Sequence, residues 1–284
     1  MSDTTVAGSP VRVGCCQISV TVGETLGNRA RVRAAIEAAA NAGARIIVLP
    51  ELANSGYMFA NLAELRTVAE SATGPSVREW ELLAQERDLV IVAGFAEAGD
   101  DGLIYNSAVL VDQTGLRAVY RKVHLWDHEK GNLFTAGSAA PPVVDTAWGR
   151  IGVAICYDLE FPEWVRSAAL DGAELLCCPV NWPLYPRPAG ERPSEIVKVQ
   201  ANAAVNRMFI AVADRTGLER GQHWLGGSVI VDADGFPLTR ITLGDETMLL
   251  ADINLAKARA KGISARNDVH ADRRPSLYTR VTDS

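Results

Sequence analysis

The fold class is set by residues 11–50, which read VRVGCCQISV TVGETLGNRA RVRAAIEAAA NAGARIIVLP. A β-branched run from Val11 to Ile18 and another from Arg45 to Leu49 flank a helical pattern from Leu26 to Ala42. In that pattern the apolar residues fall on one stripe and the charged residues fall elsewhere, which is typical of a helix packed on a sheet. A strand, a helix and a strand in this order predict an α/β fold.

Part of this stretch recurs later in the chain. Residues 43–50, GARIIVLP, align without a gap with residues 172–179, GAELLCCP, and each copy follows a helical pattern. Arg12-Val13-Gly14 likewise resembles Arg150-Ile151-Gly152. A duplicated strand–helix–strand pattern predicts two similar sheets packed together, with matching strand ends near one place. The alternative is a chance match between two α/β segments.

The rest of the chain continues the alternation of strands and helices. The expected strands are residues 89–95, 106–111, 151–156, 175–179, 209–214, 228–232 and 246–253. The expected helices are residues 76–86, 162–170 and 195–206. No linker-like stretch divides these elements, so we expect a single domain over residues 1–284, with a polar and basic tail from about residue 256.

Composition narrows the class of function. The chain has 28 Lys and Arg against 34 Asp and Glu, a net charge of −6, and no long basic run, which disfavours nucleic acid or an anionic membrane as partner. Met1 to Pro10 lack the pattern of a signal peptide, and no apolar run is long enough to span a bilayer. The five cysteines are an odd number, and four of them lie inside apolar runs, so they do not form a disulfide framework. We expect a cytoplasmic protein with a small-molecule ligand.

Two side chains that could take part in catalysis follow predicted buried strands. Glu51 lies just beyond the apolar strand 45–49, where α/β proteins commonly build their sites. Cys156 ends the predicted strand 151–156 and precedes Pro162, which suits the first turn of a helix. A strand-to-helix turn aims backbone N–H groups at the side chain and favours a thiolate. Taken alone, Glu51 could be a surface acid and Cys156 a buried structural thiol.

Lys122 and two histidines are further candidates. Lys122 is a basic residue among apolar and aromatic ones after a strand-like segment, and alone it could be a lysine that extends from a half-buried strand to solvent. His124 and His128 are four apart and could share a helix face, but the glutamate-containing zinc signature is absent. The sequence also lacks a Gly-x-Ser-x-Gly elbow and a Gly-rich phosphate loop. We therefore expect no metal site at the two histidines, and neither a serine hydrolase nor a nucleotide-binding protein is indicated.

These residues lie in three segments that resemble the three signatures of the nitrilase superfamily of carbon–nitrogen hydrolases, in the same order and with matching spacing. The segments are Leu49-Pro50-Glu51 with Gly56-Tyr57, Tyr120-Arg121-Lys122-Val123-His124-Leu125, and Cys156-Tyr157-Asp158 with Phe161-Pro162-Glu163. The resemblance covers about Val11 to Tyr278. It implies a cysteine-dependent hydrolase in which Cys156 is the nucleophile and Glu51 and Lys122 are its partners.

The resemblance carries further expectations about architecture. It implies a four-layer α-β-β-α sandwich, in agreement with the duplicated pattern. Members of the superfamily usually pair and exchange C-terminal tails, and Asp272 to Tyr278 looks like such a tail, so we expect a homodimer or a larger homo-oligomer. Glu129 falls where the superfamily has a second glutamate, although it could be an exposed acid beside Lys130. Residues 202–206 read NAAVN where the superfamily commonly has Arg-Ala-x-Glu-Asn, which leaves the role of that helix open.

The reaction implied by the resemblance is hydrolysis of a small amide through a thioester, which requires neither a metal nor an organic cofactor. Lys122 and the backbone N–H of Tyr157 would stabilise the oxyanion. Glu51 would transfer protons, and Glu129 would orient the substrate amide or Lys122. Nitrilases acting on nitriles usually have Trp-Glu after the nucleophile, whereas this chain has Tyr157-Asp158. A metal-dependent hydrolase and a non-catalytic binding protein are the other rivals, and the second is disfavoured because all three chemical residues are present.

Short, uncharged aliphatic amides are the expected substrates, with N-carbamoyl amino acids or amines as the alternative. Acidic residues after the nucleophile would repel a substrate carboxylate, whereas Arg187 and Arg192 in the proline-rich loop 182–193 could bind one. Large rings near the catalytic residues leave little volume for the substrate. The acidic residues are Asp158, Glu160 and Glu163. The expected substrate-binding residues are Tyr57, Trp126, Tyr157, Asn181 and Trp182.

Overall fold

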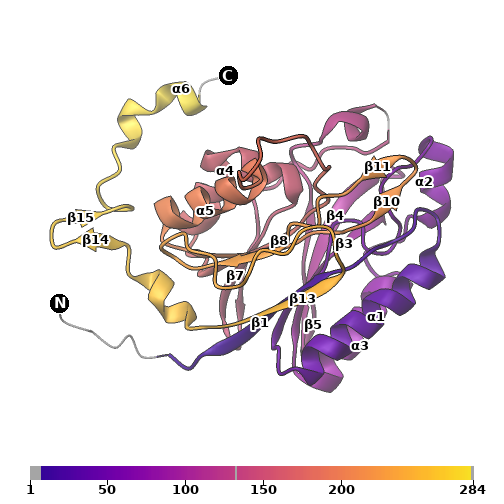
Figure 1. Ribbon diagram of the computed structural model, residues 1–284, viewed down its shortest axis with the longest axis horizontal. Coiled ribbons are helices and arrows are strands. Elements are labelled where there is room, and N and C mark those ends of the chain that lie inside the picture. The colour runs from indigo at the N-terminus through magenta and orange to yellow at the C-terminus, as the bar shows by residue number, and fades with distance from the viewer. Residues whose placement is uncertain (1–7, 132, 283–284) are drawn as a thin grey trace.

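The computed structural model describes residues 8–131 and 133–282, and these form four layers in the order α-β-β-α (Figure 1). Residues 1–7, which hold most of the N-terminal stretch considered for export, lie outside the described part. So do residues 283–284 at the end of the predicted tail. No helix within the described ranges is long and apolar enough to cross a bilayer.

The first sheet has six strands in the order β13-β1-β2-β3-β4-β5. They are β1 (Val11–Gln17), β2 (Ile46–Val48), β3 (Val90–Ala98), β4 (Ile104–Asp112), β5 (Gly115–Arg121) and β13 (Thr247–Ile253). Strands β1, β2 and β3 are parallel to one another, and the others join antiparallel. Helices α1 (Thr25–Asn41) and α3 (Pro75–Arg87) cover the outer face, and their buried apolar residues form a cluster with this sheet (Figure 1). A short helix, α2 (Leu62–Val68), lies beside β3.

The second sheet has five strands in the order β12-β9-β8-β7-β6. They are β6 (Val143–Thr146), β7 (Gly149–Val153), β8 (Leu175–Pro179), β9 (Phe209–Ala213) and β12 (Val229–Val231). Helices α4 (Pro162–Leu170) and α5 (Ser194–Asn206) cover its outer face (Figure 1). Two 3-10 turns, η1 (Asp127–Lys130) and η2 (Cys156–Glu160), follow β5 and β7.

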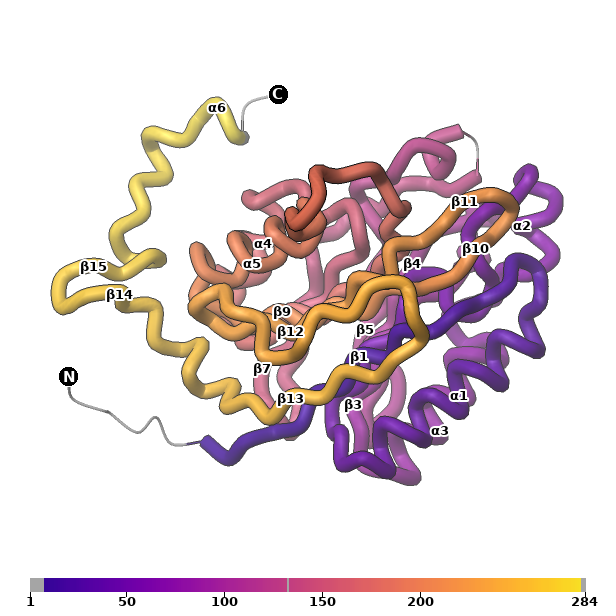
Figure 2. Tube along the Cα trace, in the orientation of Figure 1, coloured from indigo at the N-terminus to yellow at the C-terminus, as the bar shows by residue number. Residues whose placement is uncertain are grey.

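Smaller elements complete the chain. The hairpin of β10 (Leu218–Glu219) and β11 (Gln222–His223) lies between β9 and β12 in sequence. The C-terminal tail begins with η3 (Leu255–Arg259) and extends away from the sandwich on the side of α4 and α5 (Figure 2). The rest of the tail consists of β14 (Gly262–Ser264), β15 (Asn267–Asp268), η4 (Pro275–Leu277) and α6 (Thr279–Thr282).

The main core lies between the two sheets. Strand β1 contacts β9, and β3 contacts β8, across this interface. Val13 and Val48 of the first sheet belong to the same buried cluster as Val153 and Ala211 of the second. All five cysteines are free and buried, so the expectation that they do not form a disulfide framework is confirmed for the described residues.

The duplicated sequence pattern corresponds to a duplicated structure. Strands β1 and β2 form a parallel pair with Val13 opposite Ile46, and β7 and β8 form one with Ile151 opposite Leu175. In each copy a glycine with positive φ follows the helix and lies against the arginine at the second position of the first strand. The two pairs are Gly43 with Arg12 and Gly172 with Arg150. The matching strand ends meet, because the Glu51 N–H donates to the Val180 carbonyl at 3.4 Å.

Most predicted elements are confirmed, and the main errors lie at the ends of strands. Residues 162–170 and 175–179 form α4 and β8 with the predicted bounds. The strand predicted over 151–156 is wrong at its end, since β7 stops at Val153 and Cys156 opens η2 with a φ of 45°. The apolar run continues past the strand because the turn is buried as well.

One glycine controls how closely β3 approaches the segment that follows β2. A Cβ added at Gly94 of β3 would lie 2.6 Å from both the Glu51 Cα and the Leu52 N. We predict that Gly94→Ala lowers the free energy of unfolding by about 1–3 kcal/mol, because rigid backbone must move.

Gly27 of α1 is the matched control for this prediction. No atom of the described residues lies within 4 Å of a Cβ added there. Gly27 lies in the first turn of α1, so Gly27→Ala should raise stability by less than about 1 kcal/mol through helix propensity. Urea denaturation of both variants measures the effects, and a Gly94→Ala protein as stable as the parent would contradict the described packing.

Candidate active site

A buried ammonium group lies between two buried carboxylates where the two sheets meet. Lys122 follows β5, and its Nζ lies 2.7 Å from Glu51 Oε1 and 2.9 Å from Glu129 Oε1. All three side chains are no more than 1% exposed. Ionised groups are rarely buried in this way unless they are paired, so the three residues form one electrostatic unit.

Asn106 completes this unit, and the sequence analysis did not single it out. Its Nδ2 donates to Glu51 Oε1 at 2.7 Å and to Glu129 Oε1 at 2.6 Å. Its backbone carbonyl accepts a hydrogen bond from the backbone N–H of Lys122 at 2.8 Å. The only available signal was a polar asparagine in the run from Ile104 to Asp112, which is otherwise rich in apolar residues. We call Glu51, Asn106, Lys122 and Glu129 the buried cluster.

Local structure fixes each member of the buried cluster. The chain after Lys122 is anchored because Gly137 N–H donates to the Lys122 carbonyl at 2.8 Å. Glu129 lies in η1, where its Oε2 accepts the N–H of Trp126 at 2.6 Å and leaves Oε1 for the ammonium. Glu129 is therefore a buried partner of Lys122, and the alternative of a solvent-exposed acid is wrong.

Cys156 lies beside the buried cluster at the first residue of η2. It is 9% exposed, and its Sγ lies 3.9 Å from the Asn181 carbonyl oxygen. Its φ of 45° is unusual for a residue with a side chain, and such strain is concentrated at functional sites. The charges of Glu51 and Lys122 both act on the thiol. The structure therefore brings together the four residues predicted as catalytic.

Burial and neighbouring charges set the proton affinities at the site. Burial raises the pKa of Glu51 from 4.5 to about 7, although Lys122 opposes the rise. Burial lowers the pKa of Lys122, but Glu129 and Glu51 outweigh it and leave that pKa above its ordinary value. Burial and Glu51 also raise the pKa of Cys156. The expectation that the turn favours a thiolate is thus wrong for the resting site, because desolvation dominates.

Several buried polar atoms at the site have no hydrogen-bond partner among the described residues. They include Glu51 Oε2 and both amide atoms of Asn181. Asn181 is only 2% exposed. Buried polar atoms are normally paired, and unpaired ones are candidates for contacts with a ligand or a reacting group.

The other predicted substrate-binding residues have different surroundings. Tyr57 is buried, its ring packs edge-on against Trp224, and its hydroxyl is within electrostatic range of Cys156. Trp126 and Tyr157 are half-buried, with ring centroids 4.9 Å apart. Trp182 is buried in the same apolar cluster as Cys156.

Some residues considered from sequence lie elsewhere. His124 hydrogen-bonds Asp158, whereas His128 is exposed and lies near Asp127, so the two histidines do not share a site. Arg187 donates to a carbonyl of its own loop, and Arg192 hydrogen-bonds Gln200 on α5.

The acidic residues after the nucleophile do not form a repulsive patch, which corrects that expectation. Asp158 is fully buried and accepts several hydrogen bonds. Glu160 pairs with Lys198 at 2.6 Å. Glu163 lines a groove on the outer face of α4.

Comparison with known proteins identifies the family. The sequence pattern of the carbon-nitrogen hydrolase family matches residues 12–262. The chain belongs to this family, and it is a hydrolase that acts on carbon–nitrogen bonds. The resemblance to the nitrilase superfamily and the predicted α/β sandwich are thereby confirmed.

Relatives with different names share the whole length of the chain. A nitrilase from Pyrococcus abyssi is 33% identical, over 95% of this chain and 100% of the relative. An (R)-stereoselective amidase from a Pseudomonas species is 32% identical, over 96% and 95%. The structure of a mutant amidase from Nesterenkonia sp. AN1 is 25% identical with a TM-score of 0.78, over 96% and 97%. It carries the acetamide moiety of fluoroacetamide at its active-site cysteine.

The buried cluster of this hydrolase predicts a pH-dependent stability defect when its cation is removed. Lys122→Met would leave two buried carboxylates without a cation, and we expect a loss of about 3–5 kcal/mol near pH 8. Loss of the ammonium raises the pKa of Glu51 further above its unfolded value, so the folded state binds a proton more tightly. The defect should therefore be smallest below about pH 7, where Glu51 carries a proton in both folded proteins, and it should grow as the pH rises above that value.

Lys198 supplies the control, because its pair with Glu160 is partly exposed. Lys198→Met should cost about 0–1 kcal/mol. Chemical denaturation at acidic and alkaline pH measures both variants. A Lys122→Met defect no larger than that of Lys198→Met would mean that the ammonium does not neutralise buried carboxylates.

Proposed function

We propose that the protein is a cysteine-dependent amidase that hydrolyses short, uncharged aliphatic amides to carboxylic acids and ammonia. Cys156 is the nucleophile, Glu51 the proton-transfer group and Lys122 the oxyanion partner. Glu129 holds Lys122 in place, and no metal ligand set is needed for this chemistry. The amidase names of two relatives support the reaction, and the adduct on one relative's cysteine supports a thiol nucleophile.

The first half of the reaction forms a thioester. Glu51 accepts the proton of the Cys156 thiol as the sulfur attacks the amide carbon. Lys122 and the N–H of Tyr157 stabilise the resulting oxyanion. When the carbon–nitrogen bond breaks, Glu51 returns the proton to the leaving nitrogen and ammonia departs.

The second half releases the acid. Glu51 takes a proton from water as the water oxygen attacks the thioester carbon. The carbon–sulfur bond then breaks, the thiol regains a proton from Glu51 and the carboxylic acid leaves. Both halves require one group that binds and releases a proton near neutral pH.

One observation carries this assignment. Glu51 binds Lys122 and Asn106 through Oε1 alone, and its buried Oε2 has no partner among the described residues. Its pKa of about 7 suits a group that both accepts and donates protons. A carboxylate that only stabilised the fold would be expected to pair both oxygens.

A cavity that reaches the buried cluster at Glu129, though not at Cys156, is consistent with an uncharged substrate. It has a volume of about 210 Å³ and is bounded by Glu129 and Tyr57 together with mostly apolar side chains. No lysine or arginine of residues 8–131 and 133–282 lines it. A carboxylate-bearing substrate would find repulsion from Glu129 there and no cation. The other lining residues are Met58, Phe59, Ala60, His128, Leu133 and Phe134.

One observation favours the alternative of N-carbamoyl substrates. The ammonium of Lys130 lies 6.0 Å from the centroid of the Tyr157 ring, at the exposed side of the site. It could pair with the carboxylate of an N-carbamoyl amino acid. Arg187 and Arg192 instead bond to their own loop and to α5, so the substrate panel below tests Lys130 in their place.

A substrate panel tests the proposed reaction. We predict that the wild type releases ammonia from propionamide, with a higher kcat/KM than for N-carbamoyl-β-alanine or propionitrile. Cys156→Ala should abolish turnover and stay folded. Cys177→Ala, a truncation in the core of β8, should keep turnover and lose on the order of 1 kcal/mol of stability.

Two outcomes would change the assignment. Undiminished turnover by Cys156→Ala would exclude the thiol mechanism. A higher kcat/KM for N-carbamoyl-β-alanine, lost on Lys130→Ala but kept on Lys198→Ala, would establish the carbamoyl reaction instead.

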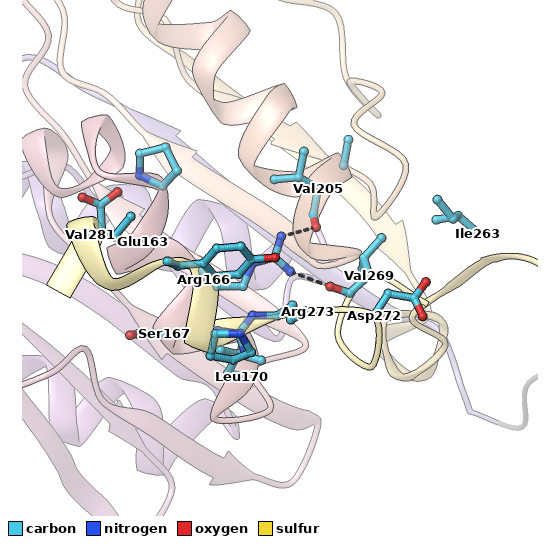
Figure 3. Close-up of a pocket in the computed structure, with 14 residues that line it drawn as sticks. Glu163, Arg166, Ser167, Leu170, Val205, Ile263, Val269, Asp272, Arg273 and Val281 are labelled. Atoms are coloured by element: carbon cyan, nitrogen blue, oxygen red, sulfur yellow. Dashed lines mark hydrogen bonds between the residues drawn. The ribbon is translucent and has the colours of Figure 1, made fainter. Parts of the chain in front are cut away.

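We further propose that the chain, as one domain, forms a homodimer in the cytoplasm and that a second copy covers the faces of α4, α5 and the tail. A groove of about 860 Å³ lies there, and Arg166 of α4 joins its walls by donating to the carbonyls of Val205 and Val269 (Figure 3). Large apolar side chains at its rim are exposed, which is typical of an interface. They are Leu170, Val205, Ile263, Tyr278 and Val281.

Light scattering at micromolar concentration tests this assembly. The wild type should have the mass of two chains or more. Val205→Glu should shift it toward one chain, because a charge would be buried at the interface. Leu82→Glu, on the exposed face of α3 in the opposite layer, should not. A wild type with the mass of one chain would overturn the proposal.

A further inference from the structure

A fully buried carboxylate joins the segment that carries the ammonium to the turn that carries the thiol. Asp158 Oδ2 accepts hydrogen bonds from the hydroxyl of Tyr120 at 2.8 Å and from the N–H of Ile155 at 2.9 Å. Its Oδ1 hydrogen-bonds the imidazole Nδ1 of His124 at 2.7 Å and accepts the N–H of the same residue at 3.2 Å. One side chain thus makes four hydrogen bonds to three residues from two segments.

The partners of Asp158 flank both reacting groups. Tyr120 lies two residues before Lys122, and His124 lies two residues after it. Ile155 immediately precedes Cys156, and Asp158 follows it by two residues. Any displacement of η2 relative to the end of β5 would therefore have to break one of these hydrogen bonds.

Neighbouring rings hold the partners in place. The indole N–H of Trp164 donates to the Tyr120 hydroxyl at 3.0 Å. The ring of His124 stacks on Phe161, with centroids 3.8 Å apart. Burial and Asp158 raise the pKa of Tyr120, so its hydroxyl remains a donor. These contacts form a rigid support behind the reacting groups rather than a surface network.

We propose that Asp158 is a positioning residue that fixes the Cys156 thiol relative to the Lys122 ammonium. The inference rests on the proposed function, because it gives these two groups their roles. Asp158 is fully buried behind the turn, and it acts through Cys156 and Lys122 rather than on the substrate. Small errors in the placement of reacting groups reduce rates far more than they reduce binding.

Asp158→Asn is the direct test, with Asp112→Asn as control. The NH₂ group of the new asparagine would face N–H or O–H groups that now donate to the carboxylate, so the turn has to move. Asp112 is also a buried carboxylate, but its partners Thr114 and Arg117 lie at the far end of β4 from Asn106. The measurements are thermal stability, kcat and KM for propionamide, and the rate of Cys156 alkylation by iodoacetamide followed by peptide mass.

The expected result separates positioning from stability. Asp158→Asn should lower kcat about 10- to 100-fold, with KM changed less than about threefold, and slow alkylation of Cys156. Asp112→Asn should lose stability and keep both rates. Tyr120→Phe removes a single hydrogen-bond donor and should give a smaller loss of kcat. This variant tests the proposal if Asp158→Asn does not fold.

Contrary results are equally distinct. Wild-type kcat and alkylation rate in Tyr120→Phe and in folded Asp158→Asn would overturn the positioning role. A loss of rate that Asp112→Asn reproduces at equal loss of stability would overturn it too. If the wild type hydrolysed no amide, the proposed function would fail, while the alkylation rates of these variants would still decide the role of Asp158.

Discussion

The burial of the Lys122 ammonium between Glu51 and Glu129 is the constraint on which the rest of the site depends. Removing such ions from water costs several kcal/mol for each ion unless their partners are close and correctly placed. The carboxylates come from separate segments, one after β2 and one in η1, and Asn106 of β4 joins them. The close approach of the strands at Gly94 is therefore a requirement of the charge arrangement as well as of packing.

The same constraint determines the chemistry. Burial raises the pKa of the Cys156 thiol, so the nucleophile has to be generated by a neighbour at the moment of reaction. Burial moves the pKa of Glu51 into the range where it can accept that proton, and Lys122 supplies a fixed positive charge for the oxyanion. The support by Asp158 extends this logic, because a reaction between fixed groups depends on their relative placement.

The sequence predicted the fold class, most helices and strands, and the four residues that meet at the site, since strand periodicity and three local signatures carry that information. Asn106 and Asp158 were respectively missed and misjudged for one reason. Asn106 contacts carboxylates 55 and 23 positions away, and Asp158 contacts Tyr120 and His124, 38 and 34 positions away. No local sequence pattern reveals such contacts. Because Asp158 stands among acidic residues, the sequence predicted an exposed charge there. The end of β7 was predicted too late because the apolar run continues to Cys156. The placement of Arg187 and Arg192 also required the structure.

The pH dependence of kcat/KM for propionamide tests the central claim most directly, because it reports the protonation of the free enzyme's essential base. Loss of the Glu51 proton should activate the enzyme, so kcat/KM should rise with pH through a midpoint at about 7. Asn106 lowers the pKa of Glu51, and Asn106→Leu should therefore move the midpoint to higher pH. Asn28→Leu should not move the midpoint. Asn28 is a buried asparagine of α1 whose side chain donates to the backbone carbonyls of Thr21 and Asn54. A midpoint near 4.5, unmoved by Asn106→Leu, would contradict the account.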